Sequence, residues 1–423
     1  MSRTLSQWLD YQATVSTRSI QLGLERVATV WEALGAPLPA PLVITVAGTN
    51  GKGSTVAFLE SMLSAAGYRS GSYTSPHLAR YNERVRIDTQ PVSEDQLCDA
   101  FERIERARAD TPLTYFEFGT LAAFCCMADA GLDVAILEVG LGGRLDAVNI
   151  VDPDVGLITG IGIDHTDWLG SDIEQIGAEK AGIARQDRPL VFAAGEMPDS
   201  IAEVADKVGA HLYRLGHDYD YQVDSDGWQW YFGASRRAGL PLPGMRGAIQ
   251  LQNAAGALAA LHLLEGLSVD QAAVREGLLR ARVPGRFEVH QRKARWILDV
   301  AHNPQAAGVL AQQLKDLYVP GTRHAVVGML GDKAIGEVFD ILSPYVDQWH
   351  LLDLSDQSRG ESAQGLLRHL PPEARSGCRL ADSVDDCMYE LDSSTGPEDE
   401  VLVFGSFVTV GLAIAWLQSA KPI

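Results

Sequence analysis

Short apolar runs alternate with stretches of helical spacing along nearly the whole of the 423-residue chain. The run PLVITVAG (41–48) predicts a buried strand, and VAFLESMLSAAG (56–67) predicts a helix after a glycine-rich turn. Further strands are predicted at 133–139, 155–160 and 189–193, and further helices at 116–130 and 173–184. Because strands that alternate with helices indicate an α/β fold, we expect a doubly wound, mostly parallel sheet in this part of the chain.

The pattern changes at 213–232, where YDYQV, the turn DSDG and WQWYF predict a β-hairpin with aromatic residues on both arms. Such an aromatic face packs against the protein more often than it holds a cofactor. The charged stretch 281–295 then leads into a second series of strands and helices, which begins with WILDVA (296–301). We therefore expect two domains, 1–287 and 288–423, of which the second is a smaller Rossmann-like α/β domain.

Composition narrows the functions that such a fold could serve. The chain carries 55 acidic and 35 basic residues, a net charge of −20, and 46% of its residues are hydrophobic. A protein this acidic repels nucleic acid and anionic membrane surfaces, so neither is expected as a partner. Five cysteines without a C-x-x-C pair, and an amino terminus without an apolar signal segment, favour a cytoplasmic location.

The carboxyl-terminal segment 401–420 carries no charge and, at about 20 residues, is long enough to span a bilayer. Gly405 and Gly411 interrupt it, however, and it opens with β-branched residues before the spacing turns helical. We expect a buried strand, a turn and a helix rather than a membrane anchor. The preceding STGPEDE (394–400) is expected to form a solvated loop.

The strongest chemical signal is AGTNGKGST (47–55), which lies between a predicted strand and a predicted helix. Glycines let successive backbone N–H groups face an anion, Lys52 can neutralise the β- and γ-phosphates, and Ser54 can bind Mg²⁺. The match to G-x-x-x-x-G-K-[ST] is incomplete, because Val46 replaces the first glycine and Gly53 separates the lysine from the serine. The alternative is a plain glycine-rich turn, which would not require a lysine.

A second group of polar residues lies within 136–170. Glu138 ends one predicted strand, and Asp164 and His165 follow another. The carboxyl ends of parallel strands are where ligands bind in open α/β sheets, which favours a Mg²⁺ site beside the phosphate loop. Taken singly, the glutamate could cap a helix and the histidine could be an interior residue. Lys180 follows in a helical stretch, where the plain alternative is a solvated lysine and carbamylation would make it an anionic oxygen ligand.

A third group lies near and beyond the domain boundary. Arg286, in VPGRFE, offers a guanidinium fork to phosphate, with a linker salt bridge as the alternative. Asp299, His302 and Asn303, in LDVAHNP, follow a predicted strand and so lie at a ligand-binding edge. For the aspartate, the alternative is a cap on the helix that begins near Pro304. A nucleotide held between two domains would explain both groups.

Together, these motifs are more specific than a general ATP site. AGTNGKGS, YTSPHLARYNERVRI, TYFEFGTLAAF, LEVGLGGRLDAVNIV, IDHTDWLG, EKAGI, PGRFE, DVAHNP and FGSF closely resemble, in this order, the folylpolyglutamate synthases, which are relatives of the Mur peptidoglycan ligases. The match is closest to the bacterial bifunctional dihydrofolate synthase/folylpolyglutamate synthases and covers nearly the whole chain. The resemblance implies a Mur-ligase-like P-loop domain, a smaller glutamate ligase domain and a monomer. It also implies ATP, two Mg²⁺ sites and, as a further option, a monovalent cation.

The resemblance further implies roles for individual residues. The ATP site would be formed by Asn50, Gly51, Lys52, Gly53, Ser54, Asn253, Arg286 and Asp299. The pterin substrate would be held by Ser19, Ile20, Gln21, Leu22, Thr114, Tyr115, Phe116, Glu117, Leu145, Asp146 and Ala147. Magnesium would be bound by Ser54, Ser75, Glu138 and His165, and catalysis would depend on Lys52, a carbamylated Lys180, His302 and Ser406. One departure is Ala334, in GMLGDKA, where similar proteins often carry an acidic residue.

The implied reaction is the ATP-dependent joining of L-glutamate to dihydropteroate and to reduced folates. The γ-phosphoryl group of ATP would pass to the substrate carboxylate, and the amine of glutamate would attack the resulting acyl phosphate. One alternative is a Mur-type muramyl peptide ligase, which would not be expected to carry TYFEFGT or SPHLARYNERV. A second is a P-loop phosphotransferase, which would leave DVAHNP unexplained.

Overall fold

The computed structural model describes residues 3–15, 21–164, 166–357, 359–381 and 383–419. These residues form two compact units. The first contains most of the chain up to Arg282, and the second runs from Val283, a few residues before the boundary predicted from the sequence. The short segments Leu78–Arg80 and Met245–Gly247 pack with the second unit. Each unit has its own sheet and its own hydrophobic core.

The first unit is built on an eight-stranded sheet among the described residues, in the order β4-β3-β2-β5-β1-β6-β7-β8. The strands are β1 (Leu42–Ala47), β2 (Ser70–Tyr73), β3 (Val85–Ile87), β4 (Gln90–Pro91), β5 (Val134–Glu138), β6 (Val155–Ile158), β7 (Pro189–Phe192) and β8 (His211–Arg214). Strands β2, β5, β1, β6, β7 and β8 run parallel, and β3 pairs antiparallel with both β2 and β4. The predicted doubly wound, mostly parallel sheet is therefore confirmed.

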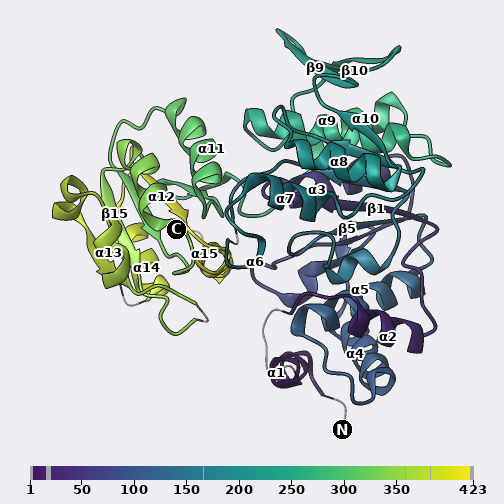
Figure 1. The fold of residues 1–423 in the computed structure, drawn as a ribbon. Coiled ribbons are helices and arrows are strands. Elements are labelled where there is room, and N and C mark those ends of the chain that lie inside the picture. Colours follow the sequence, from purple (N-terminus) through teal and green to yellow (C-terminus); the bar gives the residue numbers. More distant parts are fainter. Residues whose placement is uncertain (1–2, 16–20, 165, 358, 382, 420–423) are drawn as a thin grey trace. The chain divides into compact units, whose positions relative to one another are not determined.

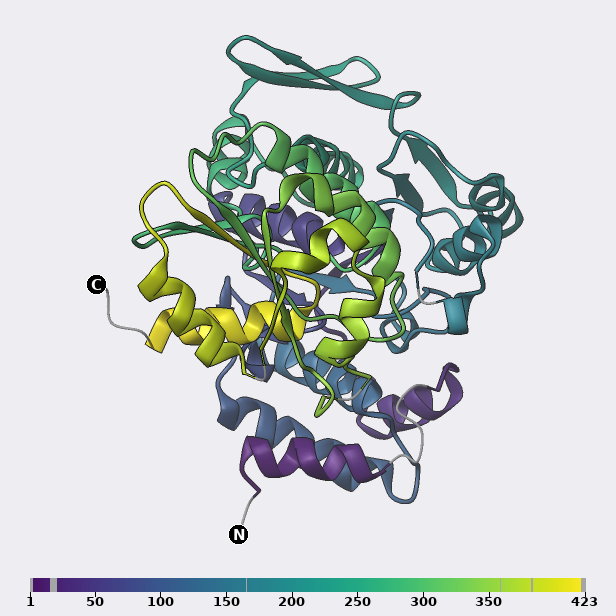
Figure 2. The ribbon, with the colours of Figure 1, turned by 90° about the vertical axis from the view of Figure 1, so that its left-hand side faces the viewer.

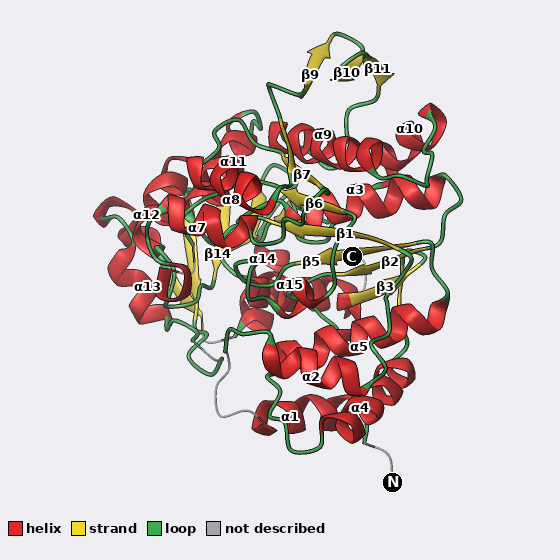
Figure 3. Cartoon of the chain, turned by 45° about the vertical axis from the view of Figure 1, so that its right-hand side comes forward, coloured by secondary structure: helices red, strands yellow, loops and turns green. Residues whose placement is uncertain are grey.

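Helices cover both faces of this sheet (Figures 1 and 3). They are α1 (Leu5–Val15), α2 (Glu25–Ala33), α3 (Lys52–Ala65), α4 (Glu94–Arg108), α5 (Tyr115–Ala130), α6 (Thr166–Leu169), α7 (Ile173–Ala181), α8 (Asp199–Val208), α9 (Ala248–Leu263) and α10 (Gln271–Arg280). Helices α3, α9 and α10 lie on one side of the sheet, and α5, with α1, α2 and α4, lies on the other. Helix α3 is buried nearly all round because α10 packs closely against it: a Cβ on Gly277 would lie 2.5 Å from Met62.

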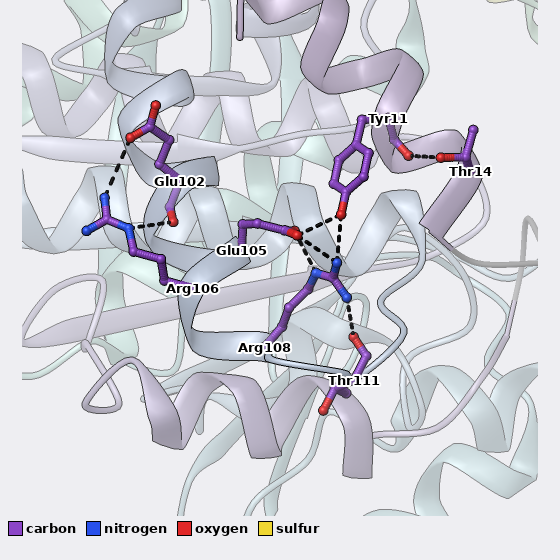
Figure 4. Close-up of polar contacts among 7 residues, drawn as sticks. All are labelled: Tyr11, Thr14, Glu102, Glu105, Arg106, Arg108 and Thr111. Atoms are coloured by element: carbon purple, nitrogen blue, oxygen red, sulfur yellow. Dashed lines mark hydrogen bonds and ion pairs between the residues drawn. The ribbon is translucent and has the colours of Figure 1, made fainter. Parts of the chain in front are cut away.

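Helix α1 is fastened to α4 by a polar cluster (Figure 4). The Tyr11 hydroxyl donates a hydrogen bond to Glu105 Oε1 at 2.6 Å. Arg108 binds both oxygens of the same carboxylate, through Nε at 2.6 Å and Nη2 at 2.8 Å, and Nη2 also donates to the Tyr11 hydroxyl. Burial, followed by the contact with Glu105, raises the pKa of Tyr11. The Arg108 charge is thus neutralised by a carboxylate in a fork geometry.

A small three-stranded sheet projects beyond α9 and α10 (Figures 1 and 2). It comprises β9 (Tyr219–Asp224), β10 (Gly227–Phe232) and β11 (Ser235–Leu240). The predicted hairpin corresponds to β9 and β10, and its aromatic residues pack: Trp228 and Trp230 are buried, and Trp230 Nε1 donates to Ala255 O at 3.2 Å. Strand β11 was not predicted, because its sequence SRRAGL lacks the alternation of apolar and polar residues that identifies a strand.

The second unit is built on a six-stranded sheet among the described residues, in the order β12-β13-β17-β14-β15-β16. Its strands are β12 (Glu288–Gln291), β13 (Arg295–Leu298), β14 (Arg323–Val327), β15 (Gln348–Leu352), β16 (Arg379–Ala381) and β17 (Glu400–Phe404). Its helices are α11 (Pro304–Lys315), α12 (Ile335–Leu342), α13 (Ala363–His369), α14 (Val384–Ser394) and α15 (Phe407–Ser419). All neighbouring strands are parallel except β12 and β13. The predicted Rossmann-like α/β architecture is confirmed.

Residues of the central strand β17 alternate between two cores. Leu402 and Phe404 pack with α11, α12 and α13, whereas Val401 and Val403 pack with α14 and α15. A sheet covered by helices on both faces needs apolar residues at every position of its central strand. The strand and helix expected in 401–420 are β17 and α15, whose buried residues belong to these cores. No helix among the described residues is long and apolar enough to cross a membrane.

Glu400 corrects the interpretation of 394–400 as a solvated loop. It is the first residue of β17 and is fully buried. Its two carboxylate oxygens lie 2.5 Å from Arg295 Nη2 and 2.5 Å from Arg323 Nε. The sequence did not reveal this because both arginines come from other strands, β13 and β14. A buried carboxylate is tolerated here because it has cationic partners.

Two histidines on β14 and β15 face each other inside the second unit. His324 Nδ1 lies 3.2 Å from His350 Nε2. Burial lowers the pKa of His350 to about 4, with smaller contributions from His324 and Arg379. Burial also lowers the pKa of His324, although Asp399 and Asp347 act in the opposite direction. Both rings are therefore neutral in the folded protein near pH 7.

We expect the second unit to lose stability as the pH falls from about 6.5 to about 4. In this range His350 binds a proton in the unfolded chain but stays uncharged in the folded protein. The loss should be on the order of 3 kcal/mol. Urea unfolding of the second unit at several pH values measures it. His350→Leu should flatten the profile in this range, whereas a change at the exposed His217 should not. Parallel profiles for the wild type and His350→Leu would contradict the prediction.

Candidate active site

The glycine-rich loop connects β1 to α3, and Lys52 is the first residue of the helix. Lys52 Nζ donates to the carbonyls of Gly48 at 3.0 Å and Thr49 at 3.2 Å. Gly48 and Gly51 have φ angles of 145° and 89°, which favour glycine. A Cβ on Gly51 would also lie 2.6 Å from Asn253 Oδ1, so this loop brings Asn253 of α9 to the predicted nucleotide site.

Thr159 braces the loop from the neighbouring strand. It follows β6 directly, and its hydroxyl donates to the Asn50 carbonyl at 2.6 Å. A backbone contact joins the same two segments, in which Thr49 N donates a hydrogen bond to Gly160 O at 2.9 Å. A Cβ on Gly48 would lie 1.9 Å from the Thr159 hydroxyl, so the loop approaches this residue closely. Sequence reasoning missed Thr159, because its role depends on β6 lying next to β1.

Thr159→Val should raise the KM for ATP roughly tenfold, because a lost hydrogen bond to a partly buried carbonyl costs about 1–3 kcal/mol. The effect on kcat should be smaller, since the side chain shapes the loop and does not touch the reacting atoms. Thr159→Ser should restore the KM. Thr45→Val is the matched control, because Thr45 is buried on β1 and its hydroxyl has no partner among the described residues. Equal effects of the two valine variants would contradict the bracing role.

Two predicted metal residues meet at the ends of adjacent strands, and a third lies in the first turn of α3. Glu138 ends β5, and its Oε2 accepts a hydrogen bond from Ser75 N, just after β2, at 3.3 Å. A Cβ on Gly53 would lie 3.9 Å from the same oxygen, and Ser54 is buried beside Gly53 in the first turn of α3. The N–H that Glu138 binds at this distance belongs to the loop after β2.

This donor set suits Mg²⁺ bound together with a nucleotide. Mg²⁺ commonly takes one or two carboxylates, several waters and the phosphates of a substrate. The described residues contain no group of three His, Cys, Asp or Glu that could hold a metal ion without such help. Asp164 follows β6 at the same edge, whereas His165, the fourth predicted ligand, lies outside the described residues.

Lys180, on α7, is 5% exposed, so the alternative of a solvated lysine is wrong. Its Nζ donates to the Gly48 carbonyl at 3.0 Å, which Lys52 also binds. Burial, and next the charge of Lys52, lowers the pKa of Lys180 to about 7, while Asp164 and Asp146 act in the opposite direction. The lowered pKa leaves more of this amine uncharged at neutral pH than is usual for lysine, and the uncharged form can act as a nucleophile.

The three predicted pterin segments lie together. Arg26 Nη2 donates to the Gln21 carbonyl at 2.9 Å and to Glu117 Oε1 at 2.8 Å, which joins the first segment to the second. Gly23 N donates to the Leu145 carbonyl at 3.4 Å, which joins the first to the third. Sequence reasoning missed Arg26, which has no recognisable motif. Of the remaining predicted residues in the first segment, Leu22 is described, and Ser19 and Ile20 lie outside the described residues.

The second segment begins α5. Thr114 and Glu117 form a capping box, in which each side chain accepts a hydrogen bond from the other residue's backbone N–H, at 3.2 Å and 2.7 Å. This box fixes the first turn, which holds Tyr115 and Phe116. The Phe116 ring would lie 2.5 Å from a Cβ on Gly140, so only glycine fits there.

The third segment is held by Asp146. Its carboxylate accepts hydrogen bonds from Leu141 N at 2.8 Å and Val148 N at 3.0 Å, and it caps the short helix that begins at Ala147. Burial raises the pKa of Asp146 to about 6, although these backbone contacts and Lys52 act in the opposite direction. The segment is thereby ordered beside the phosphate loop.

The second unit gathers its own predicted residues at the ends of β13 and β17. The Arg286 guanidinium lies 5.9 Å from the centre of the Phe407 ring, and the His302 ring lies 5.9 Å from the same ring. Asp299 accepts hydrogen bonds from Phe287 N at 2.9 Å and from Ala301 N at 2.8 Å. Burial raises the pKa of Asp299, and the charge of Arg286 acts against it.

The helices α11 and α15 of this unit are capped by polar side chains that follow β13 and β17. Asn303, not Asp299, caps α11, by accepting a hydrogen bond from Ala306 N at 2.9 Å. The alternative of a cap for Asp299 is therefore wrong. The Ser406 hydroxyl accepts from Thr409 N at 3.0 Å, so it stabilises the first turn of α15. Ala334, the departure from similar proteins, occupies the cap position of α12 without a side-chain hydrogen bond.

Comparisons with known proteins identify the family. Two family models match the chain: the Mur ligase middle domain at residues 46–261 and the Mur ligase glutamate ligase domain at residues 285–407. The dihydrofolate synthase/folylpolyglutamate synthase of Escherichia coli (strain K12) is 48% identical over 406 residues, which cover 96% of this chain and 94% of that protein.

Solved structures agree with this similarity. E. coli FolC in complex with DHPP and ADP matches with a TM-score of 0.93 and 46% identity, covering 99% of this chain and 98% of that one. The bifunctional folylpolyglutamate synthase/dihydrofolate synthase of Yersinia pestis, complexed with AMPPNP and Mn ion, matches with a TM-score of 0.91 and 47% identity, with the same coverage. The resemblance found in the motifs is thus confirmed, and the chain belongs to the dihydrofolate synthase/folylpolyglutamate synthase family of ATP-dependent Mur ligases.

Proposed function

We propose that this chain joins L-glutamate to dihydropteroate, forming dihydrofolate, and to reduced folates, forming folylpolyglutamates, with ATP as the energy source. The observation that carries this proposal is the meeting of two sites in the first unit. The phosphate loop with Glu138 and the three pterin segments occupy neighbouring strand ends and loops, and Asp146 is electrostatically coupled to both Lys52 and Lys180. The chemistry of the relatives supports the choice of substrates.

In the first step, an oxygen of the substrate carboxylate attacks the γ-phosphorus of ATP, and ADP leaves. Lys52 would move from the loop carbonyls to the phosphates and neutralise charge on them, and the N–H groups of Asn50, Gly51 and Gly53 would orient them. Ser54, Ser75 and Glu138 would hold Mg²⁺, which when bound neutralises phosphate charge. The product is an acyl phosphate, whose phosphate is a far better leaving group than a carboxylate oxygen.

In the second step, the uncharged amine of glutamate attacks the acyl carbon, the C–O bond to phosphate breaks, and the amine proton passes to solvent or phosphate. We assign Asn253, Arg286 and Asp299 to binding of the nucleotide. His302 and Ser406 are assigned to the ligation. Positioning should dominate both steps, because little acid–base chemistry is needed once the phosphate has been transferred.

We further propose that Lys180 is carbamylated. Its uncharged nitrogen attacks the carbon of CO₂, a new N–C bond forms and one proton leaves to water. The anionic oxygens that result would bind a second Mg²⁺. A monovalent cation would be an additional ion bound at the site. The pKa of about 7, which burial produces, supports this assignment, because a protonated amine cannot attack CO₂.

An acceptor assay tests the function. Purified protein with ATP, Mg²⁺ and L-glutamate should release ADP and phosphate only when dihydropteroate or tetrahydrofolate is added, and comparing the two acceptors separates the two activities. Release that is driven by a muramyl peptide, or that is equally fast without an acid, would overturn the proposal. Sedimentation in the same buffer should give the mass of a monomer.

A further inference from the structure

Arg84 is a buried arginine at the end of the segment YTSPHLARYNER. It is 8% exposed. Its Nε donates to His77 Nδ1 at 2.9 Å, and its guanidinium carbon lies 5.1 Å from the centre of the Tyr81 ring and 5.6 Å from that of the Tyr115 ring. The guanidinium is thus enclosed by three neutral or aromatic groups.

The positive charge of Arg84 has no anionic partner within the described part of the chain. His77 Nδ1 accepts the hydrogen bond and therefore carries no proton, and burial raises the pKa of Tyr81 far above its usual value. No carboxylate of the described residues lies at ion-pair distance from this guanidinium. Contacts with two tyrosine rings offset only part of the cost of burying a charge.

Two partly buried arginines of this unit are neutralised. Arg26 pairs with Glu117, and Arg108 is held in the fork of Glu105 (Figure 4). A second unsatisfied group adjoins Arg84: the buried Tyr81 hydroxyl has no hydrogen-bond partner among the described residues. The Arg84 guanidinium and the Tyr81 hydroxyl are therefore two neighbouring buried groups that a bound ligand could pair with.

The position of Arg84 suggests what the ligand is. Tyr115 belongs to the predicted pterin segment of α5, and the Tyr73 ring lies 6.0 Å from that of Phe116 in the same segment. Tyr73 ends β2 two residues before Ser75. Between them, Thr74 N donates a hydrogen bond to the Arg84 carbonyl at 2.8 Å. Arg84 therefore lies between the pterin segment and the predicted metal residue.

We propose that Arg84 binds the carboxylate of dihydropteroate, with Tyr81 and Tyr115 beside its aromatic ring. This inference rests on the proposed function and names the group that recognises the acid. The carboxylate must reach from the pterin site toward the γ-phosphate of ATP. Both groups are negatively charged, so they repel each other as they approach. A guanidinium fork matches the two oxygens of a carboxylate and reduces their repulsion by the phosphates.

The test compares two ligands on two variants, with Mg²⁺ and AMPPNP present at saturation. The ligands are dihydropteroate and its carboxamide, which has the same shape but no charge. Arg84→Met should weaken binding of the acid at least tenfold and change binding of the carboxamide less than twofold, and Arg84→Lys should give an intermediate loss. Arg108→Met controls for the loss of a partly buried arginine and should leave the ratio of the two affinities unchanged.

Each other outcome overturns the inference. Equal weakening of both ligands by Arg84→Met would assign Arg84 to packing of the aromatic cluster, and unchanged binding of the acid would place the carboxylate elsewhere. Failure of the proposed function looks different, because the wild-type protein would then bind neither ligand. Far-ultraviolet circular dichroism and thermal unfolding of each variant show that the comparison is made on folded protein.

Discussion

Replacing Lys180 by methionine is expected to reduce kcat/KM about 100- to 1000-fold, the range typical of removing one group that stabilises a transition state. The substitution keeps the length of the side chain but removes the nitrogen that would react with CO₂. The buried position of the residue makes the prediction specific, because its amine already lies 3.0 Å from the Gly48 carbonyl of the phosphate loop. Steady-state kinetics with dihydropteroate measures the loss. Lys207→Met, an exposed lysine on α8, is the control.

Carbamylation gives this prediction a direct signature. In ¹³CO₂-saturated buffer, the wild type should show a carbamate carbon resonance that Lys180→Met lacks. At fixed dissolved CO₂ the signal should weaken as the pH falls below about 7, because the amine is then protonated. Short carboxylic acids should partly restore activity to Lys180→Ala by supplying the missing anion. A fully active Lys180→Met, or a wild type without the resonance, would contradict the assignment.

The burial of Lys180 illustrates what a sequence cannot reveal. The spacing of EKAGI predicted a helix correctly, but a helical lysine is usually solvated. Its neighbours come from the loop after β5, where a Cβ on Gly143 would lie 2.7 Å from the Glu179 carbonyl. The glycines of GLGG let this loop approach the backbone of α7, and that approach excludes water from the amine.

Replacing Glu138 by glutamine should reduce kcat/KM about 100-fold and weaken binding of Mg²⁺ or Mn²⁺ in the presence of AMPPNP. Glutamine can still accept the hydrogen bond from Ser75 N, so the strand ends should keep their arrangement. The variant removes the negative charge that would neutralise the cation beside the first turn of α3. Titration with Mn²⁺, followed by electron paramagnetic resonance, measures the affinity apart from the reaction.

Glu60→Gln is the matched control for this experiment. Glu60 is a buried glutamate of α3 whose Oε1 accepts from the Ser72 hydroxyl at 3.0 Å, and its Oε2 lies 3.4 Å from Arg86. Burial raises its pKa, although Arg86 and Ser72 act in the opposite direction. We expect its loss to leave Mn²⁺ affinity within about twofold. Equal Mn²⁺ affinities of the wild type and Glu138→Gln would remove Glu138 from the metal site.

The elements that the sequence predicted correctly are those with a strong local signal. Buried strands are continuous apolar runs, and the phosphate loop combines glycines with Lys52 in a strand–loop–helix context. Thr159 and Arg26 were not assigned a role because each acts on a segment distant in the chain. Their contacts depend on strand order, which brings β6 next to β1 and β2 next to β5. Local patterns do not encode that order.

Charge burial in the second unit was equally hidden. Glu400 ends an acidic, loop-like stretch, and only the adjacency of β13, β17 and β14 surrounds it with arginines. Asp299 was considered as a possible cap of α11, but Asn303 caps this helix. Both precede Pro304 and both can cap a helix. In the fold, the asparagine is adjacent to the first turn, which leaves the aspartate to bind backbone N–H groups beside Arg286.

Transfer of oxygen from substrate to phosphate tests the central claim most directly. Dihydropteroate labelled with ¹⁸O in both carboxylate oxygens would be incubated with the protein, ATP, Mg²⁺ and L-glutamate, and the released phosphate would be analysed by mass spectrometry. An acyl phosphate intermediate predicts one ¹⁸O atom in each phosphate, and one in the amide of the dihydrofolate formed. Phosphate free of label, or label released in AMP, would contradict the account.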